Sequence, residues 1–521
     1  MSFSKQKMAV TPVWRALCAT VLIATQVLVP PWAQAQQLPG MGDGGEMTAS
    51  AERNLGDRIA RELYRDTDYI DDPVVGEYVQ DIWQRLLAAA RQRGDLTPEL
   101  DERFAWQVLL GRDRSINAFA LPGGYLGLHM GLVAVTDSRD ELATVLGHEL
   151  SHVTQRHIAR QLDRQSRQTP WLIAGMILGM LAAAKSKHGD AGQAVMAGTQ
   201  SYAMQNQLSF SRDMEREADR IGFGVMTQAG FAPQGAASMF EKLQYASRIN
   251  DNGSYPYLRS HPLNSERISD MQARFQFRAG TAPPGVPLAM EHALIAARAR
   301  VLSRPGVDVL RLWMDAADSS DFAKTSPAQQ AGTLYAAALA ASELRDMKAA
   351  RALVVRLQVR SAGDAAAARL ARLLSAEIEL AAGNAPAAVA LLDANAKDPP
   401  SLLLAAQAAV AGGKSGPTIA PRTAQLRDWV ATRPRDATAW RTLANLYGAQ
   451  NDTLRAVRAD AEANVAILDY PAARDRFKAA QELVRQSRGA AADHYEASII
   501  DTRARAIEAR VKEQAAEPPL R

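Results

Sequence analysis

The sequence contains a single cysteine among 521 residues, Cys18, which lies in an apolar stretch near the N-terminus. If that stretch is removed during export, the remaining chain has no cysteine and forms no disulfide, even in an oxidising compartment. Zinc sites built from cysteine are therefore excluded, and any metal ion must be held by histidine, aspartate or glutamate.

The chain also carries little excess charge. Its formal net charge is +4 at pH 7, with 22% charged and 47% apolar residues, which is a globular composition. Lys5, Lys7 and Arg15 supply three of those positive charges, so the chain beyond residue 35 is nearly neutral. This balance argues against nucleic acid as a partner. The length predicts two or three domains.

Residues 1–35 have the features of a cleavable signal peptide. A basic start is followed by the apolar run 16–29 and by Ala33-Gln34-Ala35, which fits a small-x-small cleavage site. An uncleaved membrane anchor is the alternative, but the run is shorter than the roughly 20 residues that span a bilayer. We expect cleavage after Ala35 and export, with residues 36–48 as a flexible, glycine-rich lead-in.

A second apolar run, residues 170–184, is also short for a membrane span. As a helix it would be roughly 22 Å long at 1.5 Å per residue, against about 30 Å for a bilayer core. A buried helix is the plain prediction. A lid over a cleft, or a peripheral contact with a membrane surface, is the alternative.

Residues 49–277 show a mixed pattern, which predicts an α+β domain that is mostly helical with a small sheet. The expected elements are two helices within 49–93 split near 66–73, a strand at 104–110, a strand–turn–strand over 116–135, a helix from Ser138 to Gln161, a helix over 208–230, and a loop leading into a helix over 257–275.

After a linker at 278–287, the composition becomes rich in alanine and lacks strand patterns. Residues 288–486 are predicted to be all-helical, and residues 487–521 a C-terminal helix and tail. One unit matches the opening of a tetratricopeptide (TPR) repeat at Trp440, Leu443, Ala444 and Tyr447, with the small Ala456 further on. A TPR-like repeat domain is therefore expected, with a generic helical bundle as the alternative.

The chemistry of the chain is concentrated in "LGHELSHVTQRH", residues 146–157. In the pattern H-E-x-x-H, His148 and His152 lie four residues apart and share one face of a helix, so both can bind one ion. Glu149 is one step round and can act on a water molecule at that ion. A chance match on a solvated helix is the alternative for so short a pattern.

The third ligand is not supplied by the same helix. The extended pattern H-E-x-x-H-x-x-G-x-x-H fails, because Gln155 and Ile158 stand at its glycine and histidine positions. His157 would be turned about 140° from His152 on a continuous helix. It is therefore predicted to be a surface histidine and not a ligand.

A glutamate from a later helix can complete the site. In "SRDMEREADRIG", Glu215 and Asp219 are four apart and share a face, whereas Glu217 points away. Glu215 would be the third metal ligand, and Asp219 could hold the N–H group of a ligand imidazole. Two histidines and a glutamate leave one position open for water, as in hydrolytic zinc sites.

These motifs, residues 148–152 and 211–219 together with "NAFALPGGY" at 117–125, resemble the zinc peptidases that include HtpX and the CAAX prenyl protease. With a signal peptide and C-terminal TPR-like helices, the chain is most similar to periplasmic proteases of the BepA type. The resemblance implies one Zn²⁺ per chain, held by His148, His152 and Glu215, with Glu149 as general base and Asp219 as a supporting catalytic acid.

The same resemblance implies a role and partners. It implies a periplasmic zinc endopeptidase that degrades misfolded or stalled outer-membrane proteins and assists their assembly. Its partners would be unfolded polypeptides and, through the TPR region, the outer-membrane β-barrel assembly machinery. The strand around Asn117–Tyr125 would offer an edge to an extended peptide, or be a plain structural hairpin. The alternative function is a TPR-based scaffold whose metal site is structural or normally latched.

His261 precedes Pro262 in a predicted loop, and spacing alone predicts a solvated histidine. A similar His-Pro loop near the active site of BepA-type relatives implies instead a fourth, inhibitory metal ligand that displaces the catalytic water. Stabilisation of the oxyanion by protonated His261 is the rival role. Under the latch His261→Ala raises peptide turnover, and under the rival role it lowers turnover.

Overall fold

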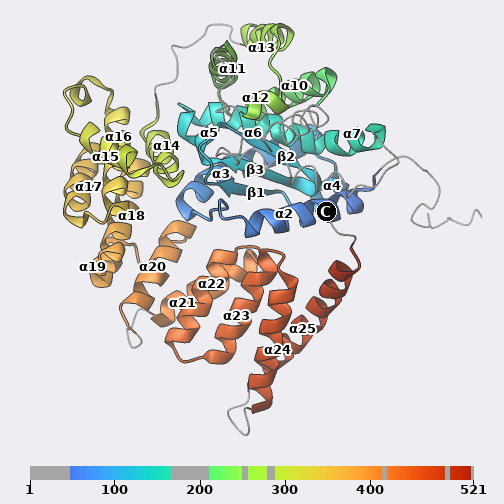
Figure 1. The fold of residues 1–521 in the computed structure, drawn as a ribbon, viewed down its shortest axis with the longest axis vertical. Coiled ribbons are helices and arrows are strands. Elements are labelled where there is room, and N and C mark those ends of the chain that lie inside the picture. The colour runs from blue at the N-terminus through green and yellow to red at the C-terminus, as the bar shows by residue number, and fades with distance from the viewer. Residues whose placement is uncertain are drawn as a thin grey trace, which may run out of the picture. The chain divides into compact units, whose positions relative to one another are not determined.

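The computed structural model describes residues 47–165, 210–248, 256–278, 288–413, 419–486 and 493–517, drawn as the coloured ribbon in Figure 1. The predicted signal peptide, most of the lead-in, the apolar segment 170–184 and linker residues 279–287 lie outside the described residues. The described residues all belong to one compact unit that begins at Met47. None of the described helices is long and apolar enough to cross a membrane.

The first helices form where capping residues precede apolar helical patterns. They are α2 (Ala49–Arg65), α3 (Pro73–Arg93) and the short α4 (Pro98–Arg103). Each begins after a side chain that accepts a hydrogen bond from the first turn, namely Thr48, Asp72 or Thr97. The two predicted helices within 49–93, separated near 66–73, agree with the structure.

A small sheet of three strands follows, in the order β1-β3-β2. Strand β3 (Tyr125–His129) lies between β1 (Gln107–Gly111), to which it is parallel, and β2 (Ala118–Leu121), to which it is antiparallel. Gly123 and Gly124 adopt φ of +71° and +84° in the connecting turn, so the predicted Pro-Gly-Gly turn is present. Strand β2 is an edge strand among the described residues.

Two of the predicted elements are wrong at their ends. The chain after β3 forms α5 (Met130–Val135) and not the continued strand expected to residue 135. Its apolar side chains pack against a helix far along the chain, α14 (Met290–Leu302), so tertiary packing decides against strand propensity. The helix expected from Ser138 to Gln161 is divided into α6 (Arg139–Thr154) and α7 (His157–Gln165).

Helix α6 is the central element of the region before α14. It begins after Ser138, whose side chain accepts a hydrogen bond from the amide of Glu141 at 3.1 Å. Every residue from Glu141 to Thr154 is buried, since α3, α10, α11 and β2 all pack against this helix. The helices of the segment that follows α7 are α10 (Arg212–Gln228), α11 (Pro233–Arg248), α12 (Pro256–Ser260) and α13 (Ser265–Arg278), seen in green in Figure 1.

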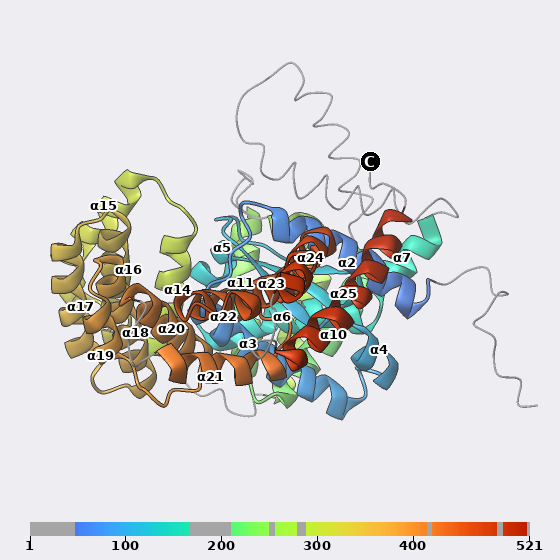
Figure 2. The ribbon, with the colours of Figure 1, turned by 90° about the horizontal axis from the view of Figure 1, so that it is seen from below.

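The rest of the described chain is all-helical apart from one short 3-10 turn, as expected. Consecutive helices pack on one another, and Figure 2 shows this packing for α16, α17, α18 and α19 from below. The helices after α14 are α15 (Val307–Ala316), α16 (Pro327–Glu343), α17 (Met347–Ser361), α18 (Ala365–Ala381), α19 (Ala385–Leu391), α20 (Pro399–Ala411), α21 (Ile419–Thr432), α22 (Ala437–Ala449), α23 (Thr453–Ala466), α24 (Tyr470–Gln486) and α25 (His494–Ala515).

The repeat-like motif lies where the TPR prediction requires a helical pair. Trp440, Leu443 and Tyr447 are buried on α22, which packs against α23. This arrangement agrees with a helix–turn–helix unit, and its assignment as a TPR stays a prediction.

Helix α14 joins the two regions of different composition. His292 contacts the hydroxyl of Tyr78 at 2.7 Å and the carbonyl of Thr136 at 2.8 Å. Arg298, buried on the same helix, pairs with Asp72 at 2.7 Å. One apolar cluster runs from α3 through α14 to α20. The packed core is therefore continuous across residue 288, where the composition changes.

Candidate metal centre

The site depends on a close approach of α6 and α10. A Cβ atom built on Gly222 of α10 would lie 2.9 Å from the backbone of Gly147 and from the amide nitrogen of His148. A side chain there would force the two helix backbones apart. The pair of glycines thus lets the H-E-x-x-H helix and the helix of Glu215 lie near enough for their side chains to meet.

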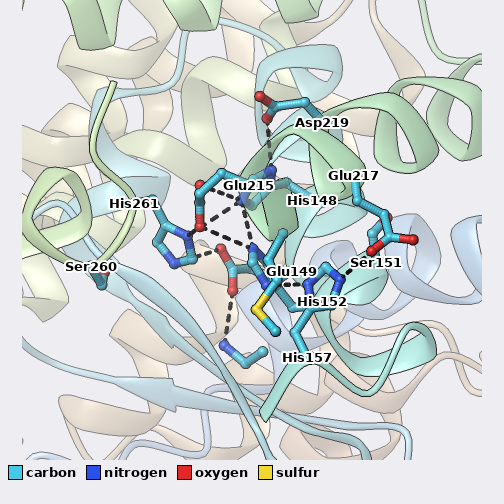
Figure 3. Close-up of polar contacts among 12 residues, drawn as sticks. His148, Glu149, Ser151, His152, His157, Glu215, Glu217, Asp219, Ser260 and His261 are labelled. Carbon is cyan, nitrogen blue, oxygen red and sulfur yellow. Dashed lines mark hydrogen bonds and ion pairs between the residues drawn. The ribbon is translucent and has the colours of Figure 1, made fainter. Parts of the chain in front are cut away.

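Four buried side chains converge between these helices, as Figure 3 shows. Each offers one ligand atom, and these atoms all lie within 4.8 Å of one another: His148, His152, Glu215 and His261. The Nε2 atoms of His148 and His152 are 3.0 Å apart, as expected for histidines four apart on one helix face. The structure therefore brings together all four of the predicted ligands.

The donor atoms fit a metal ion of the size of zinc. In a tetrahedral zinc site with bonds of about 2.0–2.2 Å, neighbouring donor atoms lie about 3.3–3.6 Å apart. Here Nδ1 of His261 lies 2.9 Å from Oε1 of Glu215 and 3.3 Å from Nε2 of His148. Oε1 of Glu215 lies 3.5 Å from Nε2 of His152. Oε2 of Glu215 is buried and faces the guanidinium group of Arg267 at 2.8 Å. This positive neighbour favours the ionised carboxylate, which is the form that binds a divalent cation.

Glu149 stands beside this cluster without belonging to it. Its Oε2 accepts a hydrogen bond from the amide of Ala120 in edge strand β2, at 2.8 Å. Its Oε1 is buried, accepts no hydrogen bond within the described residues, and lies 3.4 Å from Nε2 of His261. One carboxylate oxygen is thus fixed while the other faces the site, which suits a base that receives a proton from water.

His148 is supported from behind by a carboxylate. Its Nδ1 lies 3.0 Å from Oδ1 of Asp219. Asp219 in turn accepts two hydrogen bonds from Arg267 of α13, at 2.7 and 2.9 Å. A third guanidinium nitrogen of Arg267 lies 2.8 Å from Oε2 of Glu215. Arg267 could not be found from the sequence, because it lies 48 positions from Asp219 and no local pattern indicates the contact.

The prediction that His157 lies at the surface is wrong, whereas its absence from the four ligands agrees with the prediction. This histidine was expected at the surface, but its side chain is fully buried and lies beside His152, with the two Nδ1 atoms 2.9 Å apart. Arg156 adopts a left-handed conformation with φ of +51°, which breaks the helix between α6 and α7. The angle of about 140° assumed a continuous helix. Glu217, outside the four ligands as expected, contacts Nε2 of His157 at 3.0 Å.

The expectation from spacing alone for His261 is also wrong, because this histidine is 2% exposed and not solvated. It follows α12 directly, and its amide donates to the carbonyl of Tyr257 at 2.9 Å. The rings of Tyr257 and His261 stack at 4.7 Å, and Phe210 stacks on His152 at 4.0 Å. Aromatic rings therefore fix the orientation of two of the four ligands.

Burial and the neighbouring carboxylates set the pKa values around the cluster. Burial would lower the pKa of His148, but hydrogen bonds with Asp219 and Glu215 raise it to about 10. Burial raises the pKa of Glu149, with the neighbouring imidazoles opposing it. Burial holds the pKa of His152 well below its usual value and lowers that of His157 to about 4, so both are neutral at pH 7. Burial would raise the pKa of Asp219, but hydrogen bonds from Arg267 and His148 hold it below the usual range. Neutral imidazole is the form that binds metal.

Comparison with known proteins gives the same assignment. Residues 76–275 match the family described as "Peptidase family M48". The "Beta-barrel assembly-enhancing protease" of Escherichia coli (strain K12) is 31% identical over 461 residues, which cover 86% of this chain and 88% of that protein. The chain belongs to peptidase family M48.

Further relatives match shorter stretches. The "Putative beta-barrel assembly-enhancing protease" of Vibrio cholerae is 34% identical over 62% of this chain, and the match spans 63% of its own length. The "Mitochondrial metalloendopeptidase OMA1" of Saccharomyces cerevisiae is 27% identical over 37% of this chain and 54% of its own. This M48 protein is therefore a metallopeptidase, and the cluster of four ligands is its candidate metal centre.

Proposed function

We propose that the chain is an exported, zinc-dependent endopeptidase that degrades misfolded or stalled outer-membrane proteins and assists their assembly. The observation that carries the peptidase chemistry is the buried cluster of His148, His152 and Glu215 with Glu149 beside it. Two imidazoles and a carboxylate, with a fourth position left for water, are typical of a hydrolytic zinc site. The role in assembly is supported by the similarity to the E. coli protease over most of both chains.

The residues present can carry out peptide hydrolysis. Zinc held by His148, His152 and Glu215 would make a water molecule more acidic and polarise the scissile carbonyl. Glu149 takes the proton of the attacking water on its free Oε1 and delivers it to the leaving amine as the peptide bond breaks. Asp219 fixes the imidazole of His148 during this step.

The edge strand β2 is the natural place for the substrate backbone. It pairs with β3 on one side, and on the other its Ala120 amide reaches Glu149. An extended peptide that pairs with this edge is held next to the general base. Such recognition depends on hydrogen bonds to the substrate backbone and not on its side chains. It therefore suits unfolded substrates of many different sequences.

His261 supports a latched resting state. Its Nδ1 faces Glu215 and His148, at 2.9 and 3.3 Å, so it takes the fourth ligand position where water must enter. His261 lies between α12 and α13, whereas the other three ligands lie on α6 and α10, so its release would leave those ligands on their helices. We therefore favour the latch over the role of oxyanion donor.

The location and the partners rest on the sequence and on the relatives. Residues 1–35 as a signal peptide and the proteases named for β-barrel assembly support a periplasmic location. The packed helices of 288–486 support a TPR-like surface for the outer-membrane β-barrel assembly machinery. A contact of 170–184 with a membrane surface stays a prediction outside the described residues.

A second candidate function is a scaffold that binds assembly partners while the metal centre stays latched. The observation in its favour is the position of His261 among the other metal ligands. A latched enzyme and a scaffold differ in one respect, since only the enzyme gains turnover when the latch is removed.

The test uses the purified chain without residues 1–35 and an outer-membrane β-barrel protein, either denatured in urea and diluted or folded in detergent. Cleavage is expected for the unfolded form alone, absent in Glu149→Gln, and faster in His261→Ala. Equal cleavage of folded and unfolded barrels would contradict the proposed substrate class. A fall in turnover for His261→Ala, with metal content unchanged, would contradict the latch.

A further inference from the structure

The third histidine of "LGHELSHVTQRH" is used by none of the steps above, although it is fully buried next to a ligand. Its two ring nitrogens have different neighbours. Nδ1 lies 2.9 Å from Nδ1 of His152, and Nε2 lies 3.0 Å from Oε2 of Glu217. Arg160 of α7 donates to the same carboxylate oxygen at 2.7 Å. Figure 3 shows the line from His152 through His157 to Glu217.

The positions of the protons follow from the neighbours. Nε2 of His152 faces the other ligands, so it must present a lone pair to a metal ion, and its proton must be on Nδ1. Nδ1 of His157 then has to accept that proton's hydrogen bond, which leaves the proton of His157 on Nε2. A carboxylate only accepts, so Glu217 is the right partner for that N–H group. A single arrangement of protons therefore gives every ring nitrogen in the line His152–His157–Glu217 a suitable partner.

The backbone is arranged to hold this line. Arg156, which connects α6 to α7, has a φ of +51°, a conformation that is uncommon for residues other than glycine. Its side chain is fixed by a hydrogen bond from Nε to Oε2 of Glu52 at 2.9 Å, and by another to the carbonyl of Met47. Without this left-handed turn, His157 would face away from His152.

We propose that His157 is a positioning residue for the metal centre. It fixes the tautomer and the ring orientation of His152, and through its two hydrogen bonds it extends the electrostatic effect of the Glu217 carboxylate to His152. A ligand imidazole whose other nitrogen donates to an acceptor is a stronger and better oriented ligand. His148 receives this support directly from Asp219. His152 receives it through an intervening imidazole. The inference rests on the metal site of the proposed function.

Isosteric substitutions separate positioning from mere filling of space. In His157→Asn the side-chain oxygen occupies the place of Nδ1 and still accepts from His152. In His157→Gln the amide nitrogen occupies the place of Nε2 and still donates to Glu217, but the acceptor for His152 is lost. A group that only filled space would be equally impaired by either change.

The measurement is the rate of zinc release from the full chain without residues 1–35, followed with a chromophoric chelator, together with zinc per chain and the thermal midpoint. His157→Gln and His157→Ala are expected to weaken zinc binding about 10- to 100-fold. His157→Asn should stay within a few-fold of the parent. The matched control is His292→Asn, which removes another buried histidine with two partners, Tyr78 and Thr136.

Equal zinc release from the Asn, Gln and Ala variants, or release no faster than in the His292→Asn control, would overturn the proposal. Glu217→Gln keeps the test decisive if the His157 variants fail to fold, because its side chain is 30% exposed and tolerates change. Faster zinc release from Glu217→Gln supports the proposed role of His157 and Glu217 in holding His152, and unchanged release contradicts that role. If the parent chain binds no stoichiometric zinc, the proposed zinc site itself is wrong. This result distinguishes failure of the zinc site from failure of the role proposed for His157.

Discussion

The two sides of the metal cluster are supported in different ways. On the side of His148, Asp219 and Arg267 are both nearly fully buried, with side-chain exposures of 7% and 3%. On the side of His152, the line through His157 ends at Glu217 and Arg160, whose side chains are 30% and 41% exposed. One ligand is anchored by a buried ion pair and the other by a pair at the surface.

This difference predicts unequal consequences. Removing one member of a buried ion pair leaves the other charge buried without compensation, whereas a surface pair adds little stability. The His148 side should therefore govern folding. The His152 side should govern how tightly the metal is held, with little effect on folding.

The largest expected effect is that of Asp219→Ala, which leaves Arg267 buried without its main partner. We expect a loss of about 3–5 kcal/mol in the free energy of unfolding. Glu217→Ala on the same helix should cost about 1 kcal/mol or less. Urea unfolding with a chelator present measures both without a contribution from bound metal. Similar losses in the two variants would remove the distinction between the sides.

A smaller effect is expected for Gly222→Ala, which pushes α10 away from α6 at the place where their backbones are closest. Overpacking of this kind costs about 1–3 kcal/mol. Asp219 and Glu215 should move away from His148, so zinc release should be faster. The control is Gly76→Ala in α3, where nothing lies within 4 Å of the added carbon and helix propensity should improve. Unchanged zinc release in Gly222→Ala would mean that the helix spacing does not set the ligand geometry.

The smallest effect is expected for Arg160→Gln at the outer end of the His152 line. Its ion pair with Glu217 is partly exposed, so the free energy of unfolding should change by less than about 1 kcal/mol. Zinc release should still quicken slightly, because Glu217 is less well held. Equilibrium unfolding and chelator-monitored release on the same sample test both. A destabilisation as large as that of Asp219→Ala would show that this side also supports folding.

Local periodicity was enough for part of the site. The spacing of His148 and His152 predicts a shared helix face whatever surrounds the helix, and the same reasoning placed Glu215 with Asp219. The structure brings the ligand atoms of these helices together. The two helices before the sheet and the Pro-Gly-Gly turn could be predicted because capping residues and glycines mark their ends.

The rest depends on contacts that no local pattern reveals. Arginine has no preference for positive φ, so the break at Arg156 and the burial of His157 could not be predicted from the sequence. α5 was taken for a strand because its helix depends on packing against α14, which begins some 155 residues later. The ion pair of Arg267 on α13 with Asp219 on α10 could not be predicted either, because it also depends on how two helices pack.

The most direct test of the account measures zinc content and peptide hydrolysis side by side in the parent chain, Glu149→Gln and Glu215→Gln. If Glu149 is the general base and not a ligand, Glu149→Gln retains one zinc per chain and loses hydrolysis, whereas Glu215→Gln loses the zinc itself. Zinc loss in Glu149→Gln, or hydrolysis at the parental rate in either variant, would contradict it.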